Sequence, residues 1–412
     1  MTSVLKNQLF TPEQRQKRNY LIHQLYVRKD WDDCMTLIED TLEKVNQLAE
    51  YPLYVKGLIL RHRGNVHESL THFQLAAGIN PNNITNLKQV ARSLFLLGRH
   101  KASMDVLEQA VRVGGEEDWE LWHNKGLCLA YLRRAEEAKA AFQRANAIQR
   151  HDCTFMQLGQ LLTQEEQYEE AIDTYLEALE FSPENPDMLT TIGLLYLRMG
   201  ENYKAFDFLG NSLTHDPKNP KTILAAGSII QDHSDMDVAL VKYRVAAVAT
   251  PSSAQLWNNV GMCFFGKQRY VASIACLKKA LYLDPFEWII SYNLGLVHLN
   301  TGQYASAFHH FSASINLKPD FPSSYMHLGI TLSRLNDVAN ATAAYEKAIE
   351  MEGDFLFHLN FAVMLENNGN SDRAKEQFAE FEALYTELED DAKTSDKEVV
   401  EMRQTLKDRF GM

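Results

Sequence analysis

The chain has little cysteine, and its cysteines are scattered. Its 412 residues include five, an odd number, and no two of them form a CxxC pair. Disulfide frameworks need cysteines in even sets, and structural zinc sites need them in close pairs. The sequence therefore argues against both and predicts reduced thiols in a cytoplasmic protein.

Long hydrophobic runs are also missing. No apolar, uncharged stretch approaches the roughly 18 residues of a membrane-spanning helix. Residues 1–18 show neither an apolar segment nor a small-residue cleavage site, so we expect no secretory signal. Basic residues are the minority charge, 41 against 54 acidic ones, which gives a net charge of −13. Nucleic-acid binding needs a basic footprint, so we expect no nucleic-acid partner.

Catalytic patterns are missing as well. The 14 histidines form no HExxH motif, and there is no Gly-x-Ser-x-Gly sequence. One apparent phosphate loop runs from Gly261 to Lys267, but Gln268 follows where Mg²⁺ binding requires Ser or Thr. Its intervening residues are bulky and apolar, and its first glycine belongs to the repeat described next. We therefore expect no enzymatic activity, no cofactor and no metal site.

What the sequence does have is a period of 34 residues. Prolines recur at Pro183, Pro217, Pro251, Pro285 and Pro319. Glycines recur at Gly159, Gly193, Gly227, Gly261, Gly295 and Gly329. Large residues recur at Tyr175, Leu209, Tyr243, Leu277, Phe311 and Tyr345. Independent columns with one shared period indicate a repeated supersecondary unit.

Each column has a physical meaning. Apolar residues between the columns recur at helical spacing, and a proline that cannot continue a helix ends each unit. A glycine inside a helix costs about 1 kcal/mol relative to alanine, so close helix–helix contact must offset that cost. We expect the glycines at helix crossings, with the large residues filling the space that small residues leave.

The 34-residue pattern resembles the tetratricopeptide repeat (TPR). This resemblance implies an all-α fold, a right-handed superhelical solenoid of about eleven helix pairs. First helices would line its concave wall and second helices its convex side. The expected units begin near residues 15, 50, 84, 119, 152, 186, 220, 254, 288, 322 and 355. We expect an N-terminal extension at 1–14, the solenoid at 15–388, and an acidic linker with a C-terminal helix at 389–412.

Charge is segregated in one window. Residues 238–283 contain no Asp or Glu, but they contain six basic residues, Lys242, Arg244, Lys267, Arg269, Lys278 and Lys279. Local charge of one sign is a recognition signal. The window therefore predicts a basic dock for an acidic partner or an anionic membrane surface. A merely solvated convex surface is the alternative.

Residues 288–317, in contrast, contain no charged residue at all. A solenoid unit normally has solvent-facing sides, so an uncharged unit predicts that a partner covers them. A neutral polar surface is the alternative. The TPR resemblance places spare apolar residues on the neighbouring concave wall, and the expected partner-binding set is Met262, Phe265, Tyr292, Asn293, Leu296, Leu299, Met326 and Ile330. Amides at Asn258, Asn259, Asn293 and Asn360 are candidates to hold a peptide backbone.

Several segments are more specific than the repeat itself. Residues 86–102, 225–247, 256–280, 292–299 and 303–308 resemble the Bardet–Biedl syndrome protein 4 family. This resemblance spans about 20–385.

Members of that family are TPR subunits of the BBSome, a coat-like complex that moves membrane proteins into and out of cilia. The resemblance implies a non-enzymatic scaffold at the cilium, ciliary base and centrosome region. Its partners would be other coat subunits, with centriolar-satellite or motor-associated proteins as further candidates, and membrane association would be peripheral, through the complex. The alternative is a stand-alone TPR adaptor that links a client to a motor, centriolar satellite or chaperone.

Overall fold

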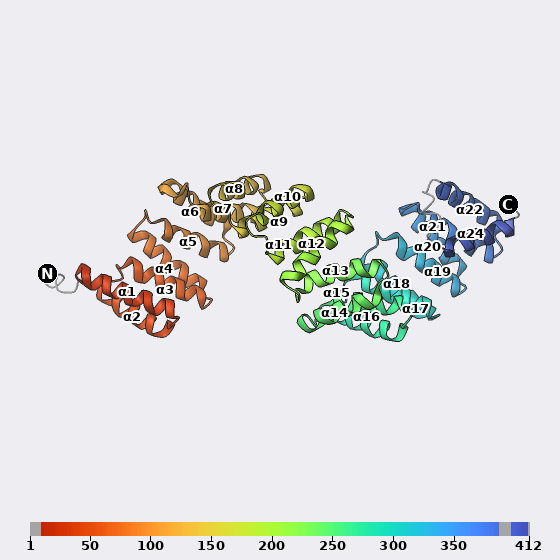
Figure 1. Ribbon diagram of the computed structural model, residues 1–412, viewed down its shortest axis with the longest axis horizontal. Helices are drawn as coiled ribbons and strands as arrows, with labels where there is room; N and C mark the ends of the chain where they lie inside the picture. Colours follow the sequence, from red (N-terminus) through yellow and green to blue (C-terminus); the bar gives the residue numbers. More distant parts are fainter. Residues whose placement is uncertain (1–9, 387–396, 411–412) are drawn as a thin grey trace. The chain divides into compact units, whose positions relative to one another are not determined.

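A computed structural model describes residues 10–386 and 397–410 of the chain. Within these ranges the regular elements are helices, and no strand occurs (Figure 1). The all-α prediction is therefore confirmed. The chain divides into an N-terminal half, residues 1–200, and a C-terminal half, residues 201–412.

The N-terminal half carries ten helices in successive pairs and one further helix. They are α1 (Pro12–Arg28), α2 (Trp31–Lys44), α3 (Glu50–His62), α4 (Val66–Ile79), α5 (Ile84–Leu96), α6 (His100–Ala110), α7 (Trp119–Tyr131), α8 (Ala135–Ile148), α9 (Asp152–Gln164), α10 (Tyr168–Leu179) and α11 (Pro186–Arg198). A π-helical turn, η2 (Val111–Gly115), follows α6. Helix α1 begins at Pro12 rather than near residue 15, because Thr11 and Gln14 form a capping box before it.

The C-terminal half begins with a single helix and continues in pairs. Its helices are α12 (Asn202–His215), α13 (Pro220–Asp232), α14 (Met236–Ala249), α15 (Ala254–Gly266), α16 (Tyr270–Leu283), α17 (Trp288–Asn300), α18 (Tyr304–Leu317), α19 (Pro322–Arg334), α20 (Val338–Met351), α21 (Phe355–Asn367), α22 (Ser371–Thr386) and α24 (Lys397–Phe410). In this half, first helices contact the first helices of the next pair, as in α15–α17 and α17–α19. In a repeat solenoid each helix pair contacts only the pairs next to it, and these contacts follow that arrangement.

Turn chemistry sets the helix boundaries. Asn185 and Asn219 cap α11 and α13 by accepting backbone N–H groups, and a proline occupies the first position of each helix. The turn after α17 needs a left-handed residue, and Gly302 supplies it with a φ of 72°. Local sequence therefore determines where these helices begin and end.

The repeated glycines lie at helix crossings, as the period predicts. A Cβ atom at Gly295 would lie 2.7 Å from the Phe311 ring, and one at Gly329 would lie 2.9 Å from the Tyr345 ring. Gly261 has the same relation to Leu277, again at 2.7 Å. Each glycine makes room for the large residue of the following helix, so the two columns form one packing unit. This prediction is confirmed at these crossings.

Helix α24 covers the last helix pair of the C-terminal half. Its Val399 and Leu406 are buried together with Phe378 and Phe381. Its Arg403 donates two hydrogen bonds to the Glu382 carboxylate, at 2.5 and 2.7 Å. Residues 389–396, the first part of the segment expected to hold an acidic linker and a C-terminal helix, lie outside the described residues. In the described part of the chain, no helix combines the length and apolar character needed to cross a bilayer.

Candidate interaction surfaces

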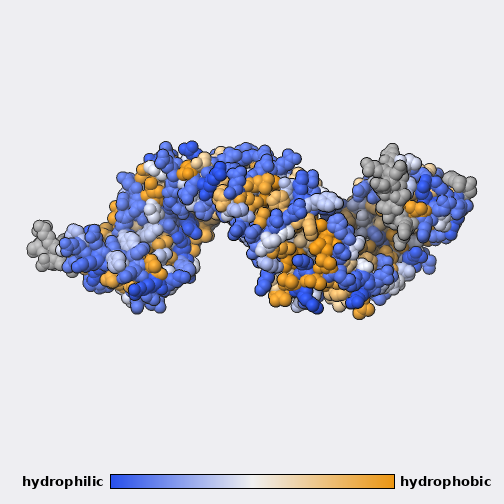
Figure 2. Space-filling model, viewed as in Figure 1, coloured by the Kyte–Doolittle hydropathy of each residue, from blue (hydrophilic) through white to orange (hydrophobic). Residues whose placement is uncertain are grey.

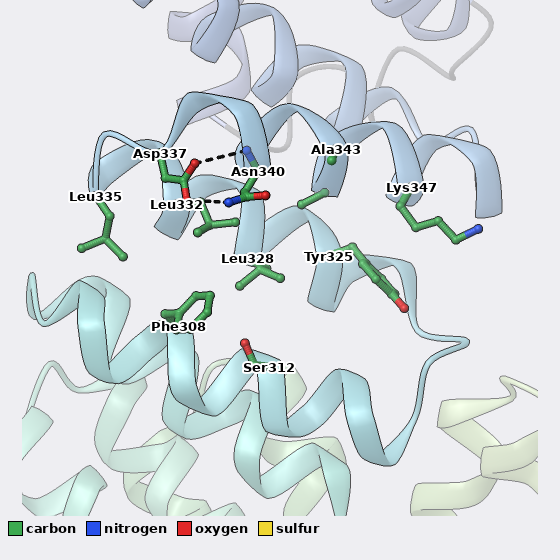
Figure 3. Close-up of a pocket in the computed structure, with 11 residues that line it drawn as sticks. Phe308, Ser312, Tyr325, Leu328, Leu332, Leu335, Asp337, Asn340, Ala343 and Lys347 are labelled. Carbon is green, nitrogen blue, oxygen red and sulfur yellow. Dashed lines mark hydrogen bonds between the residues drawn. The ribbon is translucent and has the colours of Figure 1, made fainter.

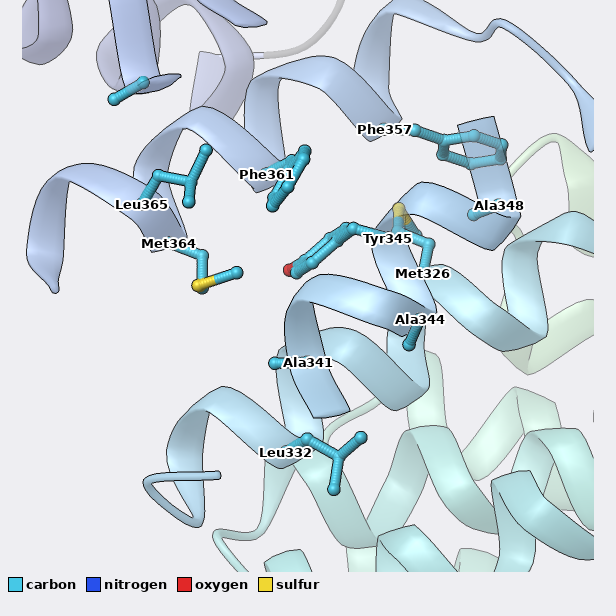
Figure 4. Close-up of a cluster of buried hydrophobic side chains, with 11 residues drawn as sticks. Met326, Leu332, Ala341, Ala344, Tyr345, Ala348, Phe357, Phe361, Met364 and Leu365 are labelled. Atoms are coloured by element: carbon cyan, nitrogen blue, oxygen red, sulfur yellow. The ribbon is translucent and has the colours of Figure 1, made fainter. Parts of the chain in front are cut away.

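The predicted partner-binding residues lie on three first helices, α15, α17 and α19. Six of the eight are half-buried, but Asn293 and Met326 are buried. Met326 is only 7% exposed and belongs to the core cluster of Tyr345, Phe357 and Phe361, where Figure 4 shows it beside Tyr345. The expectation that Asn293 and Met326 face a partner is therefore wrong, because both side chains fill space inside the repeat.

Tyr292 is packed rather than spare. Its ring centre lies 5.2 Å from that of Phe321, 5.5 Å from that of His327 and 5.8 Å from that of Phe311. Its hydroxyl oxygen lies 3.3 Å from Nδ1 of His327. Burial raises the pKa of Tyr292 to about 12. Tyr292 thus helps to join α17, α18 and α19, and it is not the spare residue that the sequence predicted.

The remaining apolar residues of the set form a shallow wall. Met262 and Phe265 pack against the buried cluster of Leu277, Leu294 and Val297. Ile330 packs against the cluster of Tyr345 and Phe361. The other members, Leu296 and Leu299, are half-buried and are the part of the predicted set that stays accessible.

The asparagines on the same helices mostly bond to one another. Asn293 donates to Asn258 at 2.9 Å, Asn258 donates to Asn259 at 3.3 Å, and Asn259 donates to the Tyr243 hydroxyl at 3.4 Å. Asn360 donates to a backbone carbonyl of its own helix at 2.9 Å. The bonds of Asn293 and Asn259 join different helices, whereas those of Asn258 and Asn360 lie within one helix. These amides thus already bond within the fold.

The six predicted basic residues differ in their surroundings. Lys242, Arg244, Arg269, Lys278 and Lys279 are exposed on or beside α14 and α16. Lys267 is half-buried and forms an ion pair with Asp237, which lies one residue before the acid-free window. Lys267 is therefore neutralised and does not belong to a free basic surface, contrary to expectation. The Lys279 ammonium lies 3.6 Å from the centre of the Trp257 ring, a cation–π contact.

Sequence reasoning missed the most exposed apolar residues, which lie on the second helices. The valine stripe of α14 consists of Val238, Val241, Val245 and Val248. On or near α16, Val271, Tyr282 and Phe286 are at least 80% exposed. Figure 2 shows hydrophobic side chains gathered over α14 and its neighbours. The valines recur at spacings of three, four and three, so helical periodicity was the signal that could have found them.

Two recesses open between helix pairs of the C-terminal half. The α14–α15 pocket has a volume of about 390 Å³ and is lined by Leu240, Val241, Arg244, Trp257 and Phe264 among others. A second recess, of about 730 Å³, lies among α18, α19 and α20 and includes Phe308, Tyr325 and Leu332 (Figure 3). Phe308, Tyr325 and Leu332 follow Leu240, Trp257 and Phe264, respectively, by two periods of 34 residues. Both recesses therefore occupy the same place in the repeat.

The uncharged stretch forms α17 and α18. Its histidines His298 and His310 stack with ring centres 5.3 Å apart. Burial lowers the pKa of His310 to about 4, with repulsion from His298 contributing. Of the large hydrophobic residues in the stretch, Leu317 is exposed, at 39%. That a partner covers this stretch stays a prediction.

The fold and these surfaces define a tetratricopeptide-repeat protein. Residues 159–200 match a model described as TPR repeat, and residues 120–152, 254–287, 290–321 and 322–355 match a model described as tetratricopeptide repeat. The crystal structure of the APC/C hetero-tetramer Cut9–Hcn1 resembles 95% of this chain over 96% of its own, with a TM-score of 0.50 at 11% identity. This likeness concerns the fold alone.

Sequence relatives then identify the family. The chain is 48% identical to the BBSome complex member BBS4 of Bos taurus, over 95% of this chain and 76% of the relative. The Mus musculus protein of the same name is 49% identical over 95% and 75%. The Drosophila melanogaster homolog is 35% identical over 88% and 78%. The chain belongs to the family of BBSome complex member BBS4.

Proposed function

We propose that this chain is a non-enzymatic scaffold subunit of a BBSome and supports transport of membrane proteins to and from cilia. The observation that carries the proposal is 48% identity to a BBSome complex member over 95% of the chain. A solenoid suits this role because its stacked helix pairs present long surfaces on two sides. The partners would be other subunits of the complex.

The distribution of apolar surface favours a subunit over a stand-alone adaptor. An adaptor needs one binding groove, whereas a subunit needs several surfaces. Here Leu296 and Leu299 are accessible on a first helix, and the valine stripe is exposed on a second helix. Centriolar-satellite or motor-associated proteins are proposed as further partners, and the cytoplasm, ciliary base and centrosome region as locations, on the strength of the family resemblance.

Co-purification tests the proposal. A tagged chain expressed at its native level in a ciliated cell should elute with other BBSome subunits in one size-exclusion peak. Leu299→Asp should reduce that co-elution, because it places a charge on the accessible first-helix wall. Leu48→Asp, at a position 70% exposed in the N-terminal half, is the matched control. Elution of the wild-type chain apart from those subunits would overturn the proposed function.

A further inference from the structure

The valine stripe of α14 is unusual for a solvent-facing helix side. The buried side of α14 is formed by Ala239, Tyr243 and Ala246, so the core already has its contacts there. Valine is β-branched and favours the helix less than alanine or leucine does, so helix propensity does not explain valines at exposed positions. Val248 is nevertheless 84% exposed. Contiguous exposed apolar residues on a folded protein mark interaction sites. The stripe therefore has the character of a contact surface.

The α14–α15 pocket adjoins this stripe through Val241, which lines it. Leu240, Val260 and Phe264 give the pocket apolar walls. The Trp257 indole is held in place because its N–H donates to the Pro251 carbonyl at 2.9 Å. At about 390 Å³ the recess is large enough to receive an apolar side chain from outside.

Positive charge borders the same pocket. Arg244 lines it, and Lys279 lies above the Trp257 ring. Together these two cations form a basic rim. In the ranges that the structure describes, no carboxylate pairs with either of them. Asp237 also lines the pocket, but its carboxylate is already paired with Lys267. The rim thus presents positive charge that an occupant can neutralise.

We propose that the valine stripe, the pocket and the basic rim together dock an acidic amphipathic segment of another protein. An apolar side chain of that segment fills the pocket and its apolar face covers the valines. Its Asp or Glu residues pair with Arg244 and Lys279. A recess beside a regular stripe fits a side chain better than a flat layer of lipid headgroups. The inference rests on the proposed function only in taking the occupant to be a protein.

A binding assay on the purified full chain tests this. The probe is a fluorescent synthetic helical peptide with Leu and Phe on one face and Glu on both flanks. The comparison peptide carries Lys in place of Glu. We expect the acidic peptide to bind and the basic one not to. Val241→Ser with Val248→Ser should weaken binding by on the order of tenfold.

The charge contribution is tested separately. Arg244→Glu with Lys279→Glu should weaken binding by on the order of tenfold at low salt, and the effect should shrink as salt is added. Matched controls lie in the N-terminal half. Val27→Ser removes a valine that is 63% exposed on α1, and Lys101→Glu with Arg144→Glu makes the same change in net charge at exposed positions. Carbodiimide cross-linking should join peptide carboxylates to Lys279.

Three results would overturn the inference. The first is equal binding of the two peptides, and the second is equal loss of binding in the variants and their controls. The third is binding to phosphatidylserine vesicles but not to the acidic peptide, lost in the same variants, which would make this a lipid-facing surface. Each of these outcomes leaves the co-purification result untouched, so failure of the docking surface is distinguishable from failure of the proposed function.

Discussion

Replacing Gly295 by alanine tests how the helix pairs are packed, because it adds one methyl group where no space is free. The new Cβ atom would lie 2.7 Å from Cδ1 and Cε1 of Phe311, whereas carbon atoms in favourable contact are about 3.5–4.0 Å apart. The Phe311 ring has little room to move, because it packs against Tyr292 and His327 with ring centres 5.8 and 5.7 Å away.

Two opposing effects set the magnitude. Overpacking a core costs about 1–3 kcal/mol, and replacing a helical glycine by alanine gains about 1 kcal/mol. The free energy of unfolding should therefore fall by up to about 2 kcal/mol. Gly78→Ala is the matched control, since Gly78 is also helical but no heavy atom lies within 4 Å of the Cβ position. That substitution should raise stability by up to about 1 kcal/mol.

Urea unfolding of the full chain, followed by far-UV circular dichroism, measures both changes. A second test combines Gly295→Ala with Phe311→Ala, because a leucine would not relieve the contact: Leu277 lies 2.7 Å from a Cβ atom at Gly261. The cost of Gly295→Ala should be smaller in the Phe311→Ala background, because the ring that the new methyl group meets is absent. If Gly295→Ala stabilises the protein as much as Gly78→Ala does, the packing argument is wrong.

Two further predictions concern the same helices. Tyr292→Glu should lower the free energy of unfolding by about 2 kcal/mol or more, because it places a carboxylate among aromatic rings, while Tyr292→Phe should cost about 1 kcal/mol; equal melting temperatures for the two variants would contradict this. His310→Gln should flatten the dependence of stability on pH between about 6.5 and 4. In that range the unfolded chain takes up a proton that the folded chain, with a depressed His310 pKa, does not, so wild-type stability falls as pH falls. Urea midpoints measured across the range should show a smaller slope for the variant, and an unchanged slope would refute the assignment.

The fold was readable from the sequence because its columns repeat with one period. Gly295 and Phe311 are 16 residues apart, as are Gly329 and Tyr345, and that constant offset already indicated that each glycine meets a large residue of the next helix. Each of these crossings sets a glycine against a large side chain, so one physical explanation accounts for them. Periodicity of this kind reports contacts that every unit must make.

The candidate surfaces were less predictable, because they depend on how individual side chains depart from the repeat. Met326 looked like a spare apolar residue, but it turns into the cluster around Tyr345. Lys267 looked like a free cation, but Asp237 lies within reach. Val241 and Val248 lie within residues 238–283, a window that the sequence distinguishes only by its charge. They are exposed because of which side of α14 faces solvent. Position in the repeat therefore predicts the core contacts better than the outer surface.

Helix α24 has a consequence for growth of the stack. When each repeat binds only the repeats next to it, nothing in those contacts limits the number of repeats. An uncovered terminal repeat can also bind the complementary end of another molecule, and such contacts build filaments. Here α24 lies against α21 and buries Val399 and Leu406, while its outward side carries Glu401, Gln404 and Asp408. The apolar end of the last pair is thereby replaced by a polar one. Helix α24 therefore acts as a cap on this helix pair, with an apolar side toward the repeat and a polar side away from it.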